Sequence, residues 1–445
     1  VVPDTVLCFL WLVIIFLAWN IYETGEKYLW YLTGIITGLS LLTKYTAFLI
    51  YPSFLLFILL IPSMRRRMKE KEPYIAFLIS IIIFLPVIIW NYENHWASFL
   101  FQFSHGLGEK KLFDGEIFLK NIGAQAGIFS PFIFFLLIYT LIWVIKQSIR
   151  KDDKSILILS FSLPVILLFT YSGLSNEVLP HWPAAGYLSL LPVLGNITYG
   201  IFSSVKKRLR YLFLLSLITG GMLTIIIPVQ ILLRPIPLSP DVDISQDITG
   251  WKELAERIRE IKTEEKEKDF FVFTHKFYIA SQLAYYLEPD IPVYCLSKSV
   301  DQYDFWQYPE NLKISLSRRN GLFFCDDQFK TTPEKFYKFS IISPAKVLPV
   351  HYKKRQIKNF YIYRCYNFDT EKTDNIFLQS LSFTPRSFKA KTIEWNEMVF
   401  FLINRYSLKN RALDIFFVSL NWLGSSFVLI PIVLVILFLK GRNQT

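Results

Sequence analysis

Long apolar runs fill the first half of the sequence and constrain its fold more than any other feature. They lie at residues 5–22, 28–43, 45–62, 75–91, 123–145, 155–171, 187–203 and 211–233, and a late one follows at 412–439. A helix needs about 20 apolar residues to cross the hydrocarbon core of a bilayer. The chain is also 53% hydrophobic and only 19% charged, which is too apolar for a soluble protein of 445 residues. We therefore predict a polytopic α-helical membrane protein with about eight spans before residue 234.

Short basic clusters orient these helices. They lie at residues 65–71, 146–154 and 206–210, after the third, fifth and seventh apolar runs. The positive-inside rule makes all three loops cytoplasmic. The net charge of +12 is distributed among such loops, so we expect a membrane partner and no nucleic acid. The start of the chain, the break at Lys44, residues 92–122 and the turn before residue 187 then face outward.

The segment 234–390 has a different composition, in which short apolar runs alternate with charged ones. The period of apolar residues predicts a helix over 250–261 and another over 277–287, and strands over 269–274, 292–296 and 321–325. We expect a small extracytoplasmic α/β domain between a membrane region (1–233) and a C-terminal region (391–445). Cys295 and Cys325 fall in the predicted strands, where we expect buried free thiols.

Two charged residues lie at the predicted outer ends of apolar runs. Asp4 opens the first run and Lys44 interrupts the apolar stretch between the second and third. Asp4 either faces headgroup water or provides a carboxylate in a cavity for a metal, a phosphate-linked donor or an acceptor hydroxyl. Lys44 either extends its ammonium to the interface or binds a lipid phosphate.

The outward segment after residue 90 combines aromatic and amide side chains. Trp90 and Trp96 fit the aromatic belt of a membrane interface. The amides of Asn91 and Gln102, with the imidazole of His95, fit that explanation less well. Aromatic faces beside amide and imidazole groups are suited to a sugar ring, so we predict substrate contacts at Asn91, His95, Trp96 and Gln102.

A second outward turn, SNEVLPHWPAAG at residues 175–186, adds an acid, a histidine and a tryptophan. A bare turn between two spans would need only small polar residues. We therefore interpret the turn as part of the wall of an outer polar site. Glu177, His181 and Trp182 are expected to contact the ligand rather than to act as the base.

Three motifs, taken in their order, resemble a known family. GLSLLTK at 38–44, PVIIWN at 86–91 and LPHWP at 179–183 are similar to the bacterial membrane glycosyltransferases of the GT-C fold, which belong with the dolichyl-phosphate-mannose protein mannosyltransferases and include the lipid A aminoarabinose transferase. GW at 250–251, LAYYL at 283–287 and QYDFW at 302–306 resemble the extracytoplasmic domain of these proteins. The resemblance covers about residues 1–330.

The resemblance implies transfer of a sugar from a polyprenyl-phosphate carrier to an acceptor (lipid A, another glycan or a protein) at the outer face of the inner membrane. Asp4 matches the second acidic position of the family and is the candidate catalytic residue. The principal acidic motif of the family belongs to a first outer loop, which we expect to precede Val1 in a longer protein. The sequence leaves open the sugar, the acceptor and whether a divalent metal takes part.

The C-terminal region carries a second resemblance. EWNEMVFFLIN at 394–404, then LD at 413–414 and LGS at 423–425, are similar to the start of a type 2 phosphatidic acid phosphatase domain. The catalytic signatures of that family would follow this region, so we expect no phosphatase site in residues 1–445. The alternative is an interfacial helix followed by an anchor span.

A polytopic lipid or glycan transporter is the alternative function. A transporter is expected to show charges at mid-span or broken helices in repeated halves. The sequence shows no internal repeat, and its charges gather at one face, which favours the enzyme.

Overall fold

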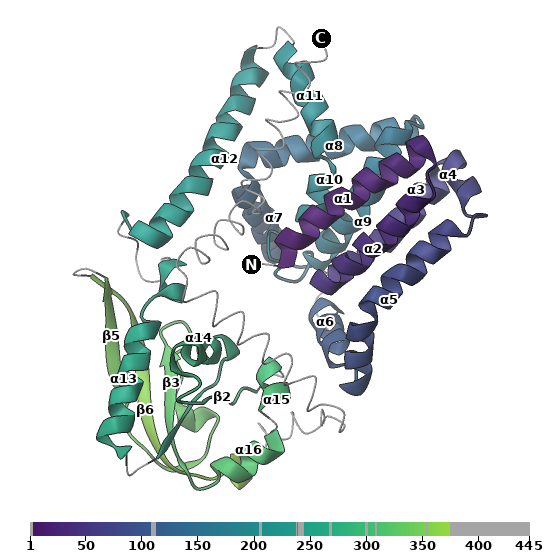
Figure 1. Ribbon diagram of the computed structural model, residues 1–445. Helices are drawn as coiled ribbons and strands as arrows, with labels where there is room; N and C mark the ends of the chain where they lie inside the picture. The colour runs from purple at the N-terminus through teal and green to yellow at the C-terminus, as the bar shows by residue number, and fades with distance from the viewer. Residues whose placement is uncertain are drawn as a thin grey trace. The chain divides into compact units, whose positions relative to one another are not determined.

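The computed structural model describes residues 3–107, 113–203, 207–236, 238, 244–266, 269–298, 301–307, 309–352 and 355–373 (Figure 1). These residues form two compact units. The first contains the described residues up to Ile227 except Glu93–Ala97, and the second contains Glu93–Ala97 and the described residues from Pro228 onward. The predicted span at 412–439 and the phosphatase-like motifs lie outside the described residues.

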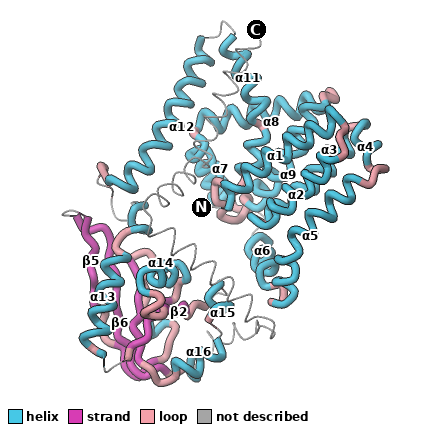
Figure 2. The backbone as a smooth tube through the Cα atoms, in the orientation of Figure 1, coloured by secondary structure: helices cyan, strands magenta, loops and turns pink. Residues whose placement is uncertain are grey.

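The first unit is helical throughout, as the tube in Figure 2 shows. Its elements are α1 (Pro3–Thr24), α2 (Tyr28–Thr43), η1 (Tyr45–Leu49), α3 (Ile50–Leu60), α4 (Pro62–Arg67), α5 (Glu72–Glu93), α6 (Ala97–Leu107), α7 (Gly115–Phe129), α8 (Pro131–Ile149), α9 (Asp153–Ser172), α10 (Ala184–Ser189), α11 (Leu191–Ser203) and α12 (Lys207–Leu233). Within the described ranges, four of them, α1, α5, α8 and α9, are long and apolar enough to cross a membrane. The prediction of a polytopic helical membrane protein is therefore confirmed.

Two predicted spans were wrong in their continuity. The run at 123–145 is divided between α7 and α8, because Ser130 has a φ of 65° and Pro131 opens a new helix. The run at 187–203 is likewise divided between α10 and α11 at Leu190. A hydropathy pattern shows only where apolar residues follow one another. It therefore cannot separate two helices when the residues at the break between them are uncharged, as Ser130, Pro131 and Leu190 are.

Polar contacts join several helices at one end of the helical unit. Tyr22, near the end of α1, donates to Asp153 at the start of α9 over 2.6 Å. Lys27, just before α2, pairs with Glu72 at the start of α5 over 3.1 Å. The side chain of Lys154 lies over the ring of Trp19. The predicted basic loops at 65–71 and 146–154 flank these starts, so both loops lie at the same end of the helical unit; their cytoplasmic side stays a prediction.

The second unit is built on a mixed sheet. Its strands are β1 (Phe270–Thr274), β2 (Val293–Cys295), β3 (Asn320–Asp326), β4 (Phe339–Ile342), β5 (Lys346–Tyr352) and β6 (Arg355–Phe368), and its helices are η2 (Ile244–Ile248), α13 (Trp251–Glu264), α14 (Phe277–Leu287), α15 (Gln302–Trp306), α16 (Pro309–Leu316), η4 (Pro333–Lys335) and η5 (Glu371–Thr373). The sheet order is β2-β1-β3-β6-β4, and β5 also pairs with β6. β1 is parallel to β2 and β3, whereas β6 is antiparallel to β3, β4 and β5.

Helices cover both faces of this sheet. Leu254 of α13 and Leu283 of α14 pack with Val272 and Leu322 in the core on one face. On the other face, Leu316 of α16 packs with the aromatic side chains of the alternate sheet positions. Because successive side chains of a strand point to opposite faces, one sheet forms both cores. This α/β architecture confirms the predicted fold class; the position of the unit outside the membrane stays a prediction.

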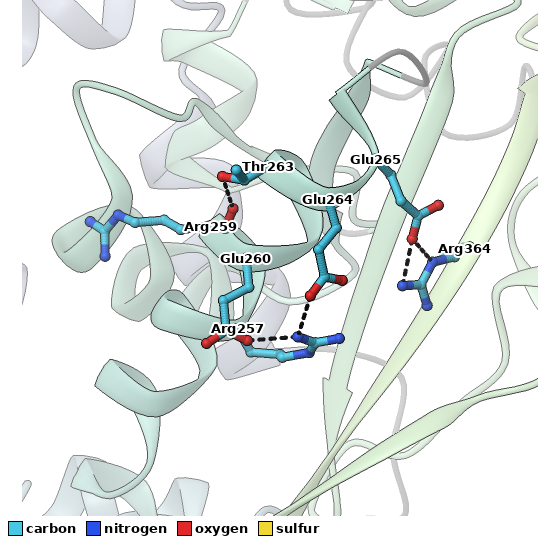
Figure 3. A network of polar contacts seen from close by, with 7 residues as sticks. All are labelled: Arg257, Arg259, Glu260, Thr263, Glu264, Glu265 and Arg364. Atoms are coloured by element: carbon cyan, nitrogen blue, oxygen red, sulfur yellow. Dashed lines mark hydrogen bonds and ion pairs between the residues drawn. The ribbon is translucent and has the colours of Figure 1, made fainter.

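Ion pairs run along α13 and join its end to the sheet (Figure 3). Arg257 pairs with Glu260 over 2.6 Å and with Glu264 over 3.4 Å along the exposed side of the helix. At the end of the helix, Glu265 accepts from Nε of Arg364 of β6 over 2.7 Å, and both side chains are only 18% exposed. The Glu265–Arg364 pair therefore fixes the end of α13 on β6.

Candidate active site at one end of the helical unit

α1 runs beside the segment that leads into α10. Trp11 is buried in α1 and donates through Nε1 to Oγ of Ser189 over 3.0 Å. Asp4 precedes Trp11 by about two helical turns, so both lie on the same side of α1. His181 precedes Ser189 by a similar stretch of chain. Because the two segments run in the same direction, the contact at Trp11 brings Asp4 close to His181.

Four of the predicted site residues meet at this end. Nζ of Lys44 lies 2.6 Å from Oδ1 of Asp4, and Nε2 of His181 lies 3.8 Å from Oδ2 of the same carboxylate. The ammonium of Lys44 is also 5.4 Å from the ring centre of Trp182, within cation–π range. The Trp182 ring in turn packs against Phe169 of α9. Segments distant in sequence thus form one polar cluster.

The cluster is only partly shielded from solvent. The side chains of Lys44 and Asp4 are 22% and 17% exposed, and that of His181 is 35% exposed. Burial lowers the pKa of His181; the carboxylate of Asp4 opposes this shift and the ammonium of Lys44 adds to it. The imidazole is therefore mainly neutral at pH 7, where it can exchange hydrogen bonds with hydroxyl groups.

A buried amide that the sequence reasoning missed holds the turn before His181. Nδ2 of Asn121, in α7, donates to the carbonyls of Gly173 and Asn176 over 3.0 and 2.7 Å. Its Oδ1 accepts from the backbone N–H of Val178 over 3.1 Å. One side chain thus satisfies three backbone groups of the turn. No signal in the sequence pointed to this role, because Asn121 is one of several polar residues in the outward segment 92–122.

Asn91 is buried and its amide is used inside the protein. Its Oδ1 accepts from Oγ of Ser98 over 2.7 Å, and its Nδ2 donates to the carbonyl of Val87 over 3.0 Å. Ser98 also shares a hydrogen bond of 2.7 Å with the hydroxyl of Tyr45, the residue that follows Lys44. Asn91 is therefore linked through Ser98 to the side chain of Tyr45, next to Lys44. Its predicted contact with substrate stays a prediction.

The other predicted contacts lie in exposed positions. Glu177 pairs with Lys120 over 2.5 Å, and both side chains are about two-thirds exposed. His95 and Trp96 have φ values of 53° and 60°, which belong to the left-handed region, and both are exposed. Gln102 lies on the exposed side of α6. The structure thus brings together Asp4, Lys44, His181 and Trp182. The predicted substrate contacts of the exposed residues stay predictions; these are His95, Trp96, Gln102 and Glu177.

The cluster offers a cation, a carboxylate, a neutral imidazole and an aromatic face. An ammonium binds phosphate oxygens, and a carboxylate accepts the proton or hydrogen bond of a hydroxyl group. Within the described residues, no group of three or more His, Cys, Asp or Glu side chains has the geometry to hold a metal ion. The cluster thus provides groups that can bind phosphate oxygens and hydroxyl groups.

Fold and site together define a polytopic membrane protein with a polar cluster at one end of its helices. Residues 1–90 match the family described as dolichyl-phosphate-mannose-protein mannosyltransferase. The chain is also 26% identical over 226 residues to lipid A galacturonosyltransferase RgtD of Rhizobium johnstonii, over 47% of this chain and 42% of that protein. No solved structure matches the chain. The resemblance to membrane glycosyltransferases is thereby confirmed, and the matched region 1–90 includes Asp4 and Lys44.

Proposed function

We propose that this chain acts as a membrane glycosyltransferase that moves a sugar from a polyprenyl-phosphate carrier to an acceptor at the outer face of the inner membrane. The acceptor is a hydroxyl group of a lipid, a glycan or a protein. The observation that carries the proposal is the pairing of Asp4 with Lys44 over 2.6 Å beside His181 and Trp182. The matches to transferases support the same class and do not favour a transporter.

Each residue of the cluster has a role in this proposal. Lys44 binds the phosphate of the donor and stabilises the charge that grows on it as the glycosidic bond breaks. Asp4 accepts the proton of the acceptor hydroxyl, whose oxygen forms the new bond to the anomeric carbon. The polyprenyl phosphate leaves with the electrons of the broken bond. His181 and the face of Trp182 position the sugar.

The ion pair between Asp4 and Lys44 is compatible with these two roles. In the absence of ligand the ammonium of Lys44 is satisfied by Asp4, so a partly buried cation is not left unpaired. A donor phosphate competes with Asp4 for that ammonium. Binding of the donor thus releases the carboxylate for the acceptor, which couples occupation of the donor site to readiness of the base.

Replacement of Asp4 by asparagine tests the catalytic part of the proposal. Asn keeps the shape and a hydrogen-bonding oxygen but cannot take a proton, so the maximal rate of sugar transfer should fall about a hundredfold or more. Donor affinity should not fall, because the carboxylate that competes with the phosphate for Lys44 has been removed. The assay uses purified protein, a polyprenyl-phosphate sugar and saturating acceptor. Lys252→Ala, which breaks an exposed ion pair with Glu256 on α13, is the control and should keep the wild-type rate. A wild-type rate in Asp4→Asn would remove Asp4 from the chemistry.

The outward placement of the site is tested by labelling in intact cells. With the native cysteines replaced, a cysteine introduced near Gln307, at the exposed position Gln302, should react with an impermeant thiol reagent, whereas one near Lys69 should not. The reverse pattern would contradict the orientation that the basic clusters predict.

A further inference from the structure

The turn that carries His181 is tied to one helix on both of its sides. Before the histidine, the backbone N–H of Val178 donates to Oδ1 of Asn121 in α7 over 3.1 Å. After it, the hydroxyl of Tyr187 in α10 donates to Oε1 of Gln125, also in α7, over 2.8 Å. The stretch between these two anchors is short. α7 therefore holds the turn at both ends of the stretch that contributes to the polar cluster.

The two anchoring amides lie on the same buried face of α7. Asn121, Gln125 and Phe129 are spaced by four residues, and all three are buried. The Phe129 ring packs on that of Tyr187 at 5.2 Å between centroids. Burying an amide costs free energy unless it is hydrogen-bonded, so apolar side chains would pack here at least as well. What the amides add is direction, because a hydrogen bond restricts both distance and angle.

The amide of Asn121 also donates to the beginning of the turn. Its Nδ2 bonds to the carbonyls of Gly173 and Asn176, which belong to the chain leaving α9. The backbone N–H of Asp114, just before α7, donates to the carbonyl of Leu174 over 2.7 Å. These bonds leave α7 and end on the backbone of the turn. The path of the turn is therefore set by where α7 lies.

The side chains that the turn presents are held less tightly than its backbone. Nε2 of His181 lies 3.8 Å from Asp4, which is beyond hydrogen-bond distance. Trp182 has ring contacts, with Phe169 at 5.8 Å between centroids and with the ammonium of Lys44 at 5.4 Å. Neither side chain is fixed by a hydrogen bond to another described residue. Their positions therefore depend on the backbone that α7 holds.

We infer that Asn121 and Gln125 are positioning residues of the polar cluster. Acting through the backbone of residues 178–187, they hold the imidazole of His181 beside the carboxylate of Asp4 and so orient the sugar that the cluster binds. The orientation of a sugar rests on the proposed function, whereas the placement of His181 does not.

Chemical modification of His181 in the full chain tests its placement without a transfer assay. Diethyl pyrocarbonate acylates the neutral imidazole, and mass spectrometry of purified protein in detergent follows each histidine as the pH is varied. Burial lowers the pKa of His181, against the charge of Asp4 and with that of Lys44. In Asn121→Ala the turn should loosen, so the midpoint of the pH profile should rise toward about 6.5. The limiting rate should rise up to about threefold, because the imidazole is only 35% exposed in the intact protein.

Two further variants make this result specific to the anchors. Gln125→Leu breaks one anchor and leaves the other, so it should shift the profile of His181 in the same direction by less, and it replaces Asn121→Ala if that variant does not fold. Thr140→Val is the matched control, because this buried hydroxyl of α8 bonds to the carbonyl of Leu136 in its own helix. It should lower the melting temperature and leave His181 unchanged. A wild-type profile of His181 in both anchor variants would overturn the inference.

Sugar transfer provides the second measurement, through a double-mutant cycle. Asn121→Ala alone should lower kcat/KM for the donor about three- to tenfold per folded molecule, chiefly by raising KM. If Asn121 acts through the turn, the same change added to His181→Ala with Trp182→Ala should cost less than about twofold. An equal loss in both backgrounds would contradict the positioning role, because Asn121 would then act independently of the two residues.

The two measurements separate this inference from the proposed function. If the wild-type chain transfers no sugar from a polyprenyl-phosphate carrier, the proposed function fails, and the reactivity of His181 still decides whether α7 holds the turn. If the profile of His181 shifts in Asn121→Ala while transfer per folded molecule stays at the wild-type level, the position of the turn does not matter to the reaction. That outcome would refute the positioning role and leave the proposed function standing.

Discussion

Replacing Lys44 by alanine separates its structural from its functional role, because the structure gives a different magnitude for each. The Lys44–Asp4 pair has an N–O distance of 2.6 Å, with side chains 22% and 17% exposed. Exposed pairs contribute about 0–1 kcal/mol, and breaking a fully buried pair costs about 3–5 kcal/mol. For this intermediate burial we expect Lys44→Ala to lower the free energy of unfolding by about 1–3 kcal/mol.

The functional effect of the same change should be larger and of another kind. A charge-assisted hydrogen bond to phosphate is worth about 1.5–3 kcal/mol, so transfer at limiting donor should fall about ten- to a hundredfold. The loss should appear in kcat/KM for the donor and not in KM for the acceptor. Lys44→Arg keeps the charge and should recover part of the activity, since a guanidinium also binds phosphate.

A double variant distinguishes the two effects. In Lys44→Ala combined with Asp4→Asn, no uncompensated carboxylate remains, so most of the lost stability should return while transfer stays low. Melting curves and donor titrations on the same preparations provide both quantities. If Lys44→Ala keeps wild-type transfer at limiting donor, Lys44 serves only the ion pair, and the assignment of the phosphate site is wrong.

The remaining predictions concern the supporting residues. His181→Ala combined with Trp182→Ala should lower transfer per folded molecule about five- to a hundredfold at low substrate, measured beside a melting curve; an unchanged specific activity with a lower melting temperature would assign both to packing. Asn91→Leu removes the hydrogen bonds of Asn91 with Ser98 and Val87 and should lower the free energy of unfolding by about 1–3 kcal/mol, read from the melting temperature; a further loss of activity per folded molecule would support its predicted contact with substrate. Burial lowers the pKa of His275 from about 6.5 in the unfolded chain to about 4 in the folded protein. As the pH is lowered the unfolded chain takes up the proton first, so the free energy of unfolding should fall by about 2 kcal/mol between pH 6.5 and pH 4. His275→Phe should remove this pH dependence, measured by hydrogen exchange of β1 and β3 with both proteins compared at equal pH.

Local features of the fold were predictable because short-range physics sets them. The predicted helix at 277–287 has the bounds of α14, and the predicted strands at 269–274 and 321–325 differ from β1 and β3 by a residue or so at each end. Apolar periodicity alone decides such elements. β4, β5 and β6 were missed, because β6 is buried on both faces along much of its length and so lacks the alternation of a one-sided strand.

The candidate site was predictable in its members but not in its contacts. Asp4, Lys44, His181 and Trp182 each stood out as polar or aromatic residues beside apolar runs, and the orientation rule placed them on the same side of the membrane. Nothing in the sequence pairs Lys44 with Asp4 in particular, since that contact depends on how the helices pack. The same limit applies to Asn91: the sequence does not show that its amide bonds to Ser98, and its contact with substrate stays a prediction.

α1 explains how the helical packing fixes the site. Asp4 and Tyr22 are separated by about five turns of helix, and Trp11 lies about two turns from Asp4, so all three occupy one stripe. Along that stripe Asp4 meets His181, Trp11 donates to Ser189 and Tyr22 donates to Asp153. All three partners lie in α9, in α10 or in the turn between them. The hydrogen bonds of Trp11 and Tyr22 resist sliding or rotation of α1 against α9 and α10, so these two residues help to set the position of the Asp4 carboxylate without themselves belonging to the polar cluster.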